Sequence, residues 1–150
     1  MSLACTEDEL RRLLKEVVFT RHFGFVLHEI ADGQCSIDVP FQHAFERPGG
    51  IVSGQVFMAA ADVAMWLAIK THLGLTDTSV TAEMKTNFLG SAKGEAFRCT
   101  ARVLKFGRHL IYGVAECVDR RGRLLTHHTV TYIRVEQSTT NASHKTGTAN

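Results

Sequence analysis

The chain has 150 residues and a formal net charge of +2, and 45% of its residues are hydrophobic. This length fits one domain with its own core, and the small charge gives no reason to expect a nucleic-acid partner. No stretch reaches the roughly 18 charge-free apolar residues that a membrane-spanning helix needs, so membrane association is not expected. The acidic start predicts no secretory signal. The four scattered cysteines form no CxxC pair, and they indicate reduced thiols in a cytoplasmic protein.

The first segment is predicted to be a short amphipathic helix. Thr6 and Glu9 have the spacing of a capping box, and leucines and valines follow at helical intervals. Two strands, over 23–30 and 34–39, are then predicted to form a hairpin, because Ala31-Asp32-Gly33 between them is typical of a turn. A loop over 40–52 leads to the next element.

That element is a long helix over 54–73, ended by Gly74. Its residues leave no polar face, so we expect neighbouring elements to cover it on nearly all sides. The remainder reads as strands over 78–89, 95–106, 109–119 and 124–135, separated by short glycine-containing turns. Such a series predicts an antiparallel sheet of five or six strands curled around one long helix, an α+β fold. Residues 1–135 would form this single domain, with 1–22 as N-terminal helix and linker, and 136–150 a disordered tail.

The central helix carries one carboxylate, Asp62, in apolar surroundings. Burial of an ionised carboxylate is costly, so this residue needs a partner, a shifted pKa or a chemical function. The helix start is rich in glycine, at positions 49, 50 and 54, and offers free N–H groups and the positive end of the helix dipole. Such a start can stabilise a developing oxyanion. Acid and helix start together indicate an active site.

The pattern Arg47-x-x-Gly50-x-x-Ser53-Gly54-Gln55, with Asp62 nine residues after Ser53, resembles a known family. The phenylacetyl-CoA (PaaI-like) thioesterases have N-x-x-G-x-x-H-G-G with an Asp nine residues after the His. The resemblance spans about 23–135 and includes Asn87-Phe88-Leu89 and Gly107-Arg108. It implies the hotdog fold, in which a curved sheet wraps one central helix.

The resemblance also implies an acyl-CoA thioesterase that hydrolyses an acyl- or aryl-CoA to the free acid and coenzyme A. Asp62 would be base or nucleophile, and the Gly54 amide the oxyanion donor. The alternatives are a structural acid that bonds a neighbouring chain or a buried water, and a glycine required only for packing. Coenzyme A is part of the substrate, and no separate cofactor and no metal are expected. This chain has Arg47, Ser53 and Gln55 where the family has Asn, His and Gly. The alternative is therefore a non-catalytic acyl-CoA-binding or regulatory protein; a dehydratase ranks lowest, because no histidine follows the glycine turn.

Several candidate binding residues have open roles. Ser53 either bonds the thioester oxygen or caps the helix. Thr81 either positions a water beside the acid or is an ordinary strand residue. Arg47 either pairs with a neighbouring subunit or a ligand phosphate, or is a solvated loop residue. Gly50 and Gln55 belong to the same turn and helix start. The basic residues at two hairpin turns either form a patch for the coenzyme A phosphates or form a solvated face: Lys105, Arg108, Arg120, Arg121 and Arg123.

Helix geometry predicts an oligomer. Ser53 and Asp62 are separated by about 13 Å of helix rise and by two and a half turns, so they face opposite sides. If both act on one thioester, they must come from different subunits, which predicts a homodimer or homotetramer. Five large apolar residues are candidates for an acyl or aryl pocket, or for the core: Phe57, Met58, Met65, Trp66 and Phe88.

Overall fold

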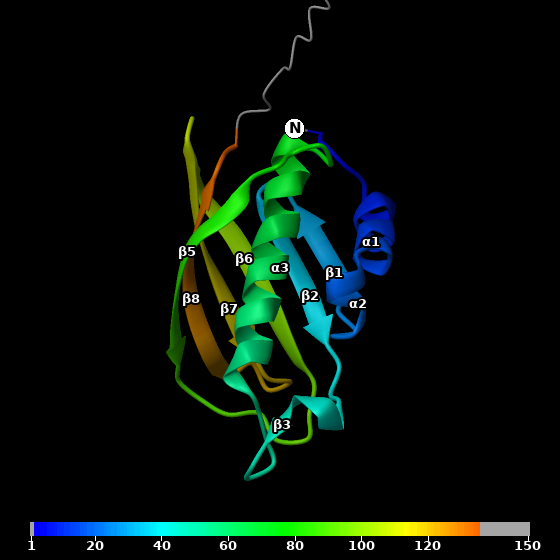
Figure 1. The fold of residues 1–150 in the computed structure, drawn as a ribbon, viewed down its shortest axis with the longest axis vertical. Helices are drawn as coiled ribbons and strands as arrows, with labels where there is room; N and C mark the ends of the chain where they lie inside the picture. Colours follow the sequence, from blue (N-terminus) through cyan, green and yellow to red (C-terminus); the bar gives the residue numbers. More distant parts are fainter. Residues whose placement is uncertain (1, 136–150) are drawn as a thin grey trace, which may run out of the picture.

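A computed structural model describes residues 2–135 of the chain, so the predicted tail over 136–150 lies outside the described residues. Six antiparallel strands form one sheet against which the long helix α3 (Gly54–Leu73) packs (Figure 1). The strand order is β1-β2-β6-β7-β8-β5. The bounds are β1 (Val26–Ala31), β2 (Gln34–Val39), β5 (Val80–Phe88), β6 (Phe97–Phe106), β7 (Leu110–Val118) and β8 (Leu124–Ile133). This is the predicted α+β hotdog arrangement.

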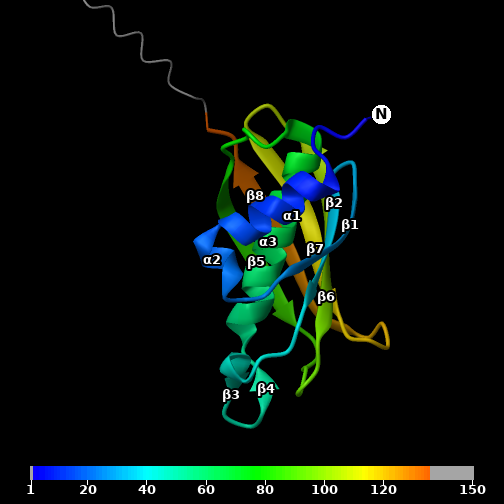
Figure 2. The ribbon, with the colours of Figure 1, turned by 90° about the vertical axis from the view of Figure 1, so that its right-hand side faces the viewer.

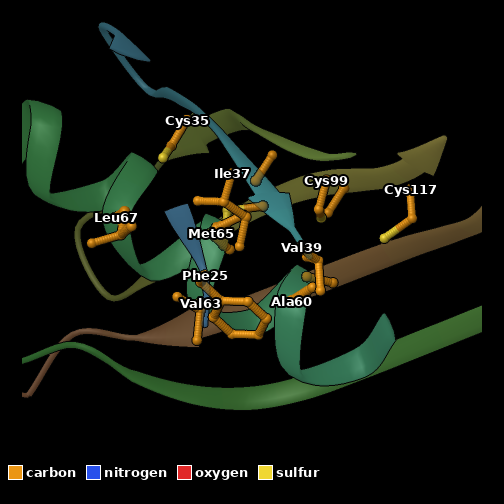
Figure 3. Packing of buried hydrophobic residues seen from close by; sticks show 14 of the residues in the cluster. Phe25, Cys35, Ile37, Val39, Ala60, Val63, Met65, Leu67, Cys99 and Cys117 are labelled. Atoms are coloured by element: carbon orange, nitrogen blue, oxygen red, sulfur yellow. The ribbon is translucent and has the colours of Figure 1, made fainter. Parts of the chain in front are cut away.

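The core lies between α3 and the inner face of the sheet. Ile37 of β2 and Leu67 of α3 are fully buried, and Figure 3 shows Ile37 beside Met65 of α3. Alternation along each strand sends every second side chain to this face, for which β7 gives the clearest pattern. All four cysteines are buried and free.

One face of α3 departs from the prediction of nearly complete cover. Gln55 and Met58 are exposed, and Asp62 and Trp66 are half-buried, at spacings of three, four and four residues. These four residues, the α3 stripe, lie on the face of the helix that the rest of the fold covers least. The helix is long and apolar enough to span a membrane, but 67% of its most apolar window is buried inside the fold, which makes it a core helix.

The N-terminal segment lies on the same side of the sheet as α3, next to β1 (Figures 1 and 2). Thr6 and Glu9 form the predicted capping box at the start of α1 (Glu7–Glu16). A second helix, α2 (Val18–Arg21), falls in the stretch predicted as linker. It is only four residues long, which is too short for a periodicity to reveal. In Figure 2, α1 crosses in front of α3, and α2 lies beside it.

The predicted loop over 40–52 contains more structure than expected. It holds a short 3-10 helix, His43–Phe45, and a two-stranded ribbon of β3 (Glu46–Arg47) and β4 (Ile51–Val52). The turn between β3 and β4 is closed by a bond from the Gly50 N–H to the Arg47 carbonyl, at 3.1 Å. Gly49 has φ of 102°, which the third residue of a Pro-Gly type II turn requires. The ribbon brings the chain to the start of α3.

Candidate active site

Asp62 is held by two hydroxyl groups from the sheet. Thr81 Oγ1 donates to Asp62 Oδ1 at 2.7 Å, and the Tyr132 hydroxyl lies 2.7 Å from the same oxygen. Tyr132 also lies 3.0 Å from the main-chain oxygen of Asp62, so its single hydrogen is shared between the two acceptors. No donor of residues 2–135 reaches Oδ2. The carboxylate is therefore oriented through one oxygen and leaves the other available for chemistry.

Tyr132 is the site residue that sequence reasoning missed. It faces Thr81 across β5 and β8, where the two residues are register partners. Burial raises the pKa of the Tyr132 phenol, and the neighbouring Asp62 charge raises it further, so the hydroxyl stays protonated and can donate. Position 132 continues the series of buried residues at every second position of β8, but only the strand register shows which side chain it meets.

Asp62 opens onto a groove of about 360 Å³. The apolar part of its wall comes from two elements besides the sheet: Val63 and Trp66 of α3, and Val17 and Phe19 of the N-terminal segment. Polar groups come from Thr20, Ser79, Thr81 and Tyr132. Among the described residues, Asp62 is the one charged group in this lining, so the groove suits an uncharged, largely apolar group next to the carboxylate.

The helix start lies away from this groove. Ser53 is the N-cap of α3, but its hydroxyl bonds the Gln55 side chain and caps no backbone N–H. Gly54 is half-buried, and a side chain added there would come within 2.9 Å of the Phe88 ring. Neither Ser53 nor Gly54 lines the Asp62 groove within one protomer. The structure thus keeps the acid and the predicted oxyanion donor apart, as the helix geometry requires.

Arg47 and Gln55 are both exposed near the helix start, and Gly50 closes the adjacent turn. None of the three contacts Asp62. Gly50 has φ of 71°, and a Cβ added to it would meet no described atom within 4 Å. Its backbone conformation, not crowding, therefore favours glycine there.

The structure separates the basic residues that the sequence grouped as one patch. Lys105 and Arg108 lie at the β6–β7 turn, and Arg120 and Arg121 at the β7–β8 turn, at opposite ends of β7. Nine residues of strand place these turns roughly 30 Å apart. The prediction that these residues form a single patch on one protomer is therefore wrong.

Contacts assign each turn to one end of α3. At the β7–β8 turn, Arg123 Nη2 donates to the Ser91 carbonyl at 3.3 Å. The next residue, Ala92, accepts a bond at its carbonyl from the N–H of Val52, which lies just before α3, so this turn lies at the helix start. At the other end, the Phe106 ring stacks on His72 in the last turn of α3. Arg120 and Arg121, both exposed, therefore share an end of the molecule with Gly54.

The apolar pocket candidates divide between core and surface. Phe57 and Met65 are buried core residues, which removes them as ligand contacts. Trp66 lines the Asp62 groove, and Lys70 Nζ lies 5.1 Å from its ring centroid. Met58 belongs to the α3 stripe, and Phe88 lies exposed over Gly54.

Comparisons with known proteins identify the family of the chain. The sequence profile of the thioesterase superfamily matches residues 49–126, just over half of the chain, including the glycine turn, α3 and Asp62. This chain belongs to the thioesterase superfamily. A Saccharolobus solfataricus protein whose name marks it as a candidate esterase is 32% identical over 69% of this chain and 69% of its own length.

Solved structures share the fold. A protein of Silicibacter sp., described as a candidate thioesterase, is 29% identical and has a TM-score of 0.81, covering 91% of this chain and 96% of its own. The PaaI protein of E. coli, from the phenylacetic acid degradation operon, has a TM-score of 0.78 at 14% identity, covering 86% of this chain and 92% of its own. The predicted hotdog fold and the resemblance to the thioesterases are confirmed.

Proposed function

We propose that this protein is an acyl-CoA thioesterase that hydrolyses an acyl- or aryl-CoA to the free acid and coenzyme A. The observation that carries the proposal is the Asp62 carboxylate in the lining of an apolar groove, where Thr81 and Tyr132 hold Oδ1 and no hydrogen bond within residues 2–135 occupies Oδ2. A carboxylate so placed can act as a general base or as a nucleophile, and membership of the thioesterase superfamily supports the reaction class.

Thioester hydrolysis needs little more than these groups. In one route Asp62 takes a proton from a water whose oxygen attacks the carbonyl carbon; the tetrahedral intermediate then collapses, the C–S bond breaks, and the thiolate leaves. In the other route Asp62 attacks the carbonyl itself, expels the thiolate and forms a mixed anhydride that water hydrolyses. Both routes place negative charge on the carbonyl oxygen, where a backbone N–H is the stabilising group.

The Gly54 amide of a second subunit is the proposed oxyanion donor. Within one protomer the N–H lies about 12 Å along the helix from Asp62, too far to serve the same carbonyl. The α3 stripe and the exposed edge of β5 support an assembly, because Val80, Phe88 and Met58 leave apolar surface uncovered there. We propose a homodimer with two shared sites, or a homotetramer built from such dimers.

Arg120 and Arg121 are the proposed contacts for the coenzyme A phosphates. Both are exposed and lie at the end of the molecule that carries Gly54. Arg108 and Lys105 lie at the other end and would serve the same thioester only through another subunit. A cytoplasmic location, expected from the reduced thiols, also belongs to the proposal.

A non-catalytic acyl-CoA-binding protein is the second candidate. It is favoured by Arg47 and Ser53 at the positions of the family's Asn and His, and by the bond that joins the Ser53 hydroxyl to the Gln55 side chain. This candidate requires binding without turnover.

A thiol-release assay separates the two candidates. Purified protein is incubated with a panel from acetyl-CoA to long-chain and aryl-CoA thioesters, and free coenzyme A is titrated with a chromogenic disulfide. The thioesterase proposal expects turnover of at least one thioester that is lost in Asp62→Asn. Binding of acyl-CoA by calorimetry with no thiol release above the uncatalysed rate would favour the second candidate.

A further inference from the structure

The groove at Asp62 has a wall that lies outside the part of the chain matched by the superfamily. The match begins at residue 49, whereas Val17, Phe19 and Thr20 line the groove beside Asp62 and Trp66. The N-terminal segment therefore contributes a surface to the site from outside the matched part of the thioesterase fold.

This segment is fastened in place by specific bonds. The Thr20 hydroxyl, in a residue only 3% exposed, lies 3.0 Å from the carbonyls of both Leu14 and Val17. Arg11 Nη1 donates to the Leu27 carbonyl at 2.9 Å, and the Ala4 N–H donates to the Thr71 carbonyl at 2.8 Å. The N-terminal segment is thus attached to β1 and to the last turns of α3, and Figure 2 shows α1 crossing in front of α3.

Phe19 is an exposed apolar residue with a fixed ring. It exposes 63% of its surface, yet it makes edge contacts with Phe23 and His22 at ring-centroid distances of 5.6 and 5.8 Å. Trp66 of α3 packs under the Lys70 ammonium group. Lys70 Nζ is itself fixed, because it donates to the carbonyls of Leu75 and Asp77. Two aromatic side chains on separate elements are therefore pre-positioned at one groove.

The chemistry of the groove selects the part of the substrate that it accepts. Within residues 2–135, no lysine or arginine lines it, and its one charge is the Asp62 carboxylate, which repels phosphate. Its volume of about 360 Å³ lies at the lower end of ligand pockets, so it suits one acyl or aryl group and not a whole acyl-CoA. The thioester carbonyl must reach Asp62, which leaves the acyl body to fill the groove.

We propose that Phe19, together with Trp66, forms the acyl-binding wall and sets a preference for apolar acyl groups larger than acetyl. This assignment rests on the proposed function for its substrate class. Phe19 is a specificity-determining residue: it contacts the acyl body, not the reacting carbonyl, so its removal weakens binding of large acyl groups selectively.

The test uses two thioether analogues that cannot be hydrolysed, S-hexyl-CoA and S-methyl-CoA, with dissociation constants measured by calorimetry. Wild type is expected to bind S-hexyl-CoA at least about 10-fold more tightly, the size of effect that hydrophobic pockets give. Phe19→Ala should lose about that factor for S-hexyl-CoA with S-methyl-CoA unchanged. Val18→Ala is the matched control: Val18 is 69% exposed on the same helix but does not line the groove, and its selectivity should equal that of wild type.

Binding separates this assignment from the thioesterase proposal. Phe19-dependent selectivity without thiol release would uphold the wall and contradict hydrolysis. Equal affinity for the two thioethers in wild type, or the same loss in Phe19→Ala and Val18→Ala, would overturn the wall whatever the hydrolysis assay gives. Conversion of Phe19→Ala to a smaller species in sedimentation, with unchanged selectivity, would assign the groove to a subunit contact and overturn it too.

Discussion

Tyr132 and Asp62 are 70 residues apart in the sequence, and their side chains are joined at 2.7 Å. The tyrosine comes from β8 and the half-buried aspartate from the middle of α3, so the bond joins the central helix to the sheet. Thr81 of the neighbouring strand β5 completes the arrangement. This geometry fixes one oxygen of a carboxylate that lines the groove.

The first prediction concerns Asp62→Asn. The amide keeps the shape and the bonds from Thr81 and Tyr132 but has no negative charge, so kcat should fall roughly 10²–10⁴-fold. Melting temperature and oligomeric state should stay close to wild type. Measurement of kcat, Tm and sedimentation on this one variant distinguishes a catalytic from a structural acid. Full turnover in Asp62→Asn would falsify the mechanism.

The second prediction concerns the two hydroxyls. Tyr132→Phe removes the phenol without changing the ring, and a lost bond to a charged group costs about 1.5–3 kcal/mol, so kcat should fall about 10-fold or more. Thr81→Val removes the other donor at nearly constant shape. If both only orient Asp62, the double variant should lose less than the product of the single losses, because both bond the same oxygen. A rise in KM with unchanged kcat in either variant would instead make the hydroxyl a substrate contact.

The third prediction isolates the Gly54 amide. Gly54 is the first residue of α3, where proline is well tolerated, and Ser53 has φ of −62° and ψ of 142°, which a residue before proline can adopt. Gly54→Pro removes the N–H and should lower kcat roughly 10²–10³-fold, the cost of one oxyanion donor. Gly54→Ala is the control, since it adds a Cβ at the same place against Phe88 but keeps the N–H. Equal losses in the two variants would assign Gly54 a packing role.

The fourth prediction tests whether the site is shared. A dimer with Asp62 from one chain and Gly54 from the other has one intact site when Asp62→Asn and Gly54→Pro subunits combine. Random mixing of the two inactive variants should then restore about a quarter of wild-type activity, because half of the dimers are mixed and each has one intact site. A monomer at micromolar concentration in sedimentation, with activity retained, would contradict the shared site.

The fifth prediction compares the two basic turns. Replacement of Arg120 and Arg121 by Ala should raise KM for acyl-CoA with kcat nearly unchanged, the result of losing uniform binding. Arg108→Ala, at the opposite end of β7, reports whether that turn takes part through another subunit. If KM is the same in all variants, these arginines are a solvated face.

Much of the architecture is determined by the sequence alone. Thr6 and Glu9 set the start of α1, and the apolar run ending at Gly74 sets the length of α3, because capping and periodicity are local properties. The short turns after β6 and β7 require antiparallel neighbours. The nine-residue spacing of Ser53 and Asp62 is also local, and it alone separates acid from helix start.

The partners of Asp62 were decided by tertiary structure. Tyr132 meets Thr81 only through the register of β5 against β8, and a shift of one residue would put the two hydroxyls on opposite faces of the sheet. The same holds for Phe19, which reaches the groove because bonds at Thr20 and Arg11 fix a four-residue helix that has no periodicity of its own. Arg108 and Arg120 looked equivalent as turn residues, but the strand between them is longer than their side chains can span. Periodicity fixes which face a residue occupies; what it meets there depends on register and packing between distant segments.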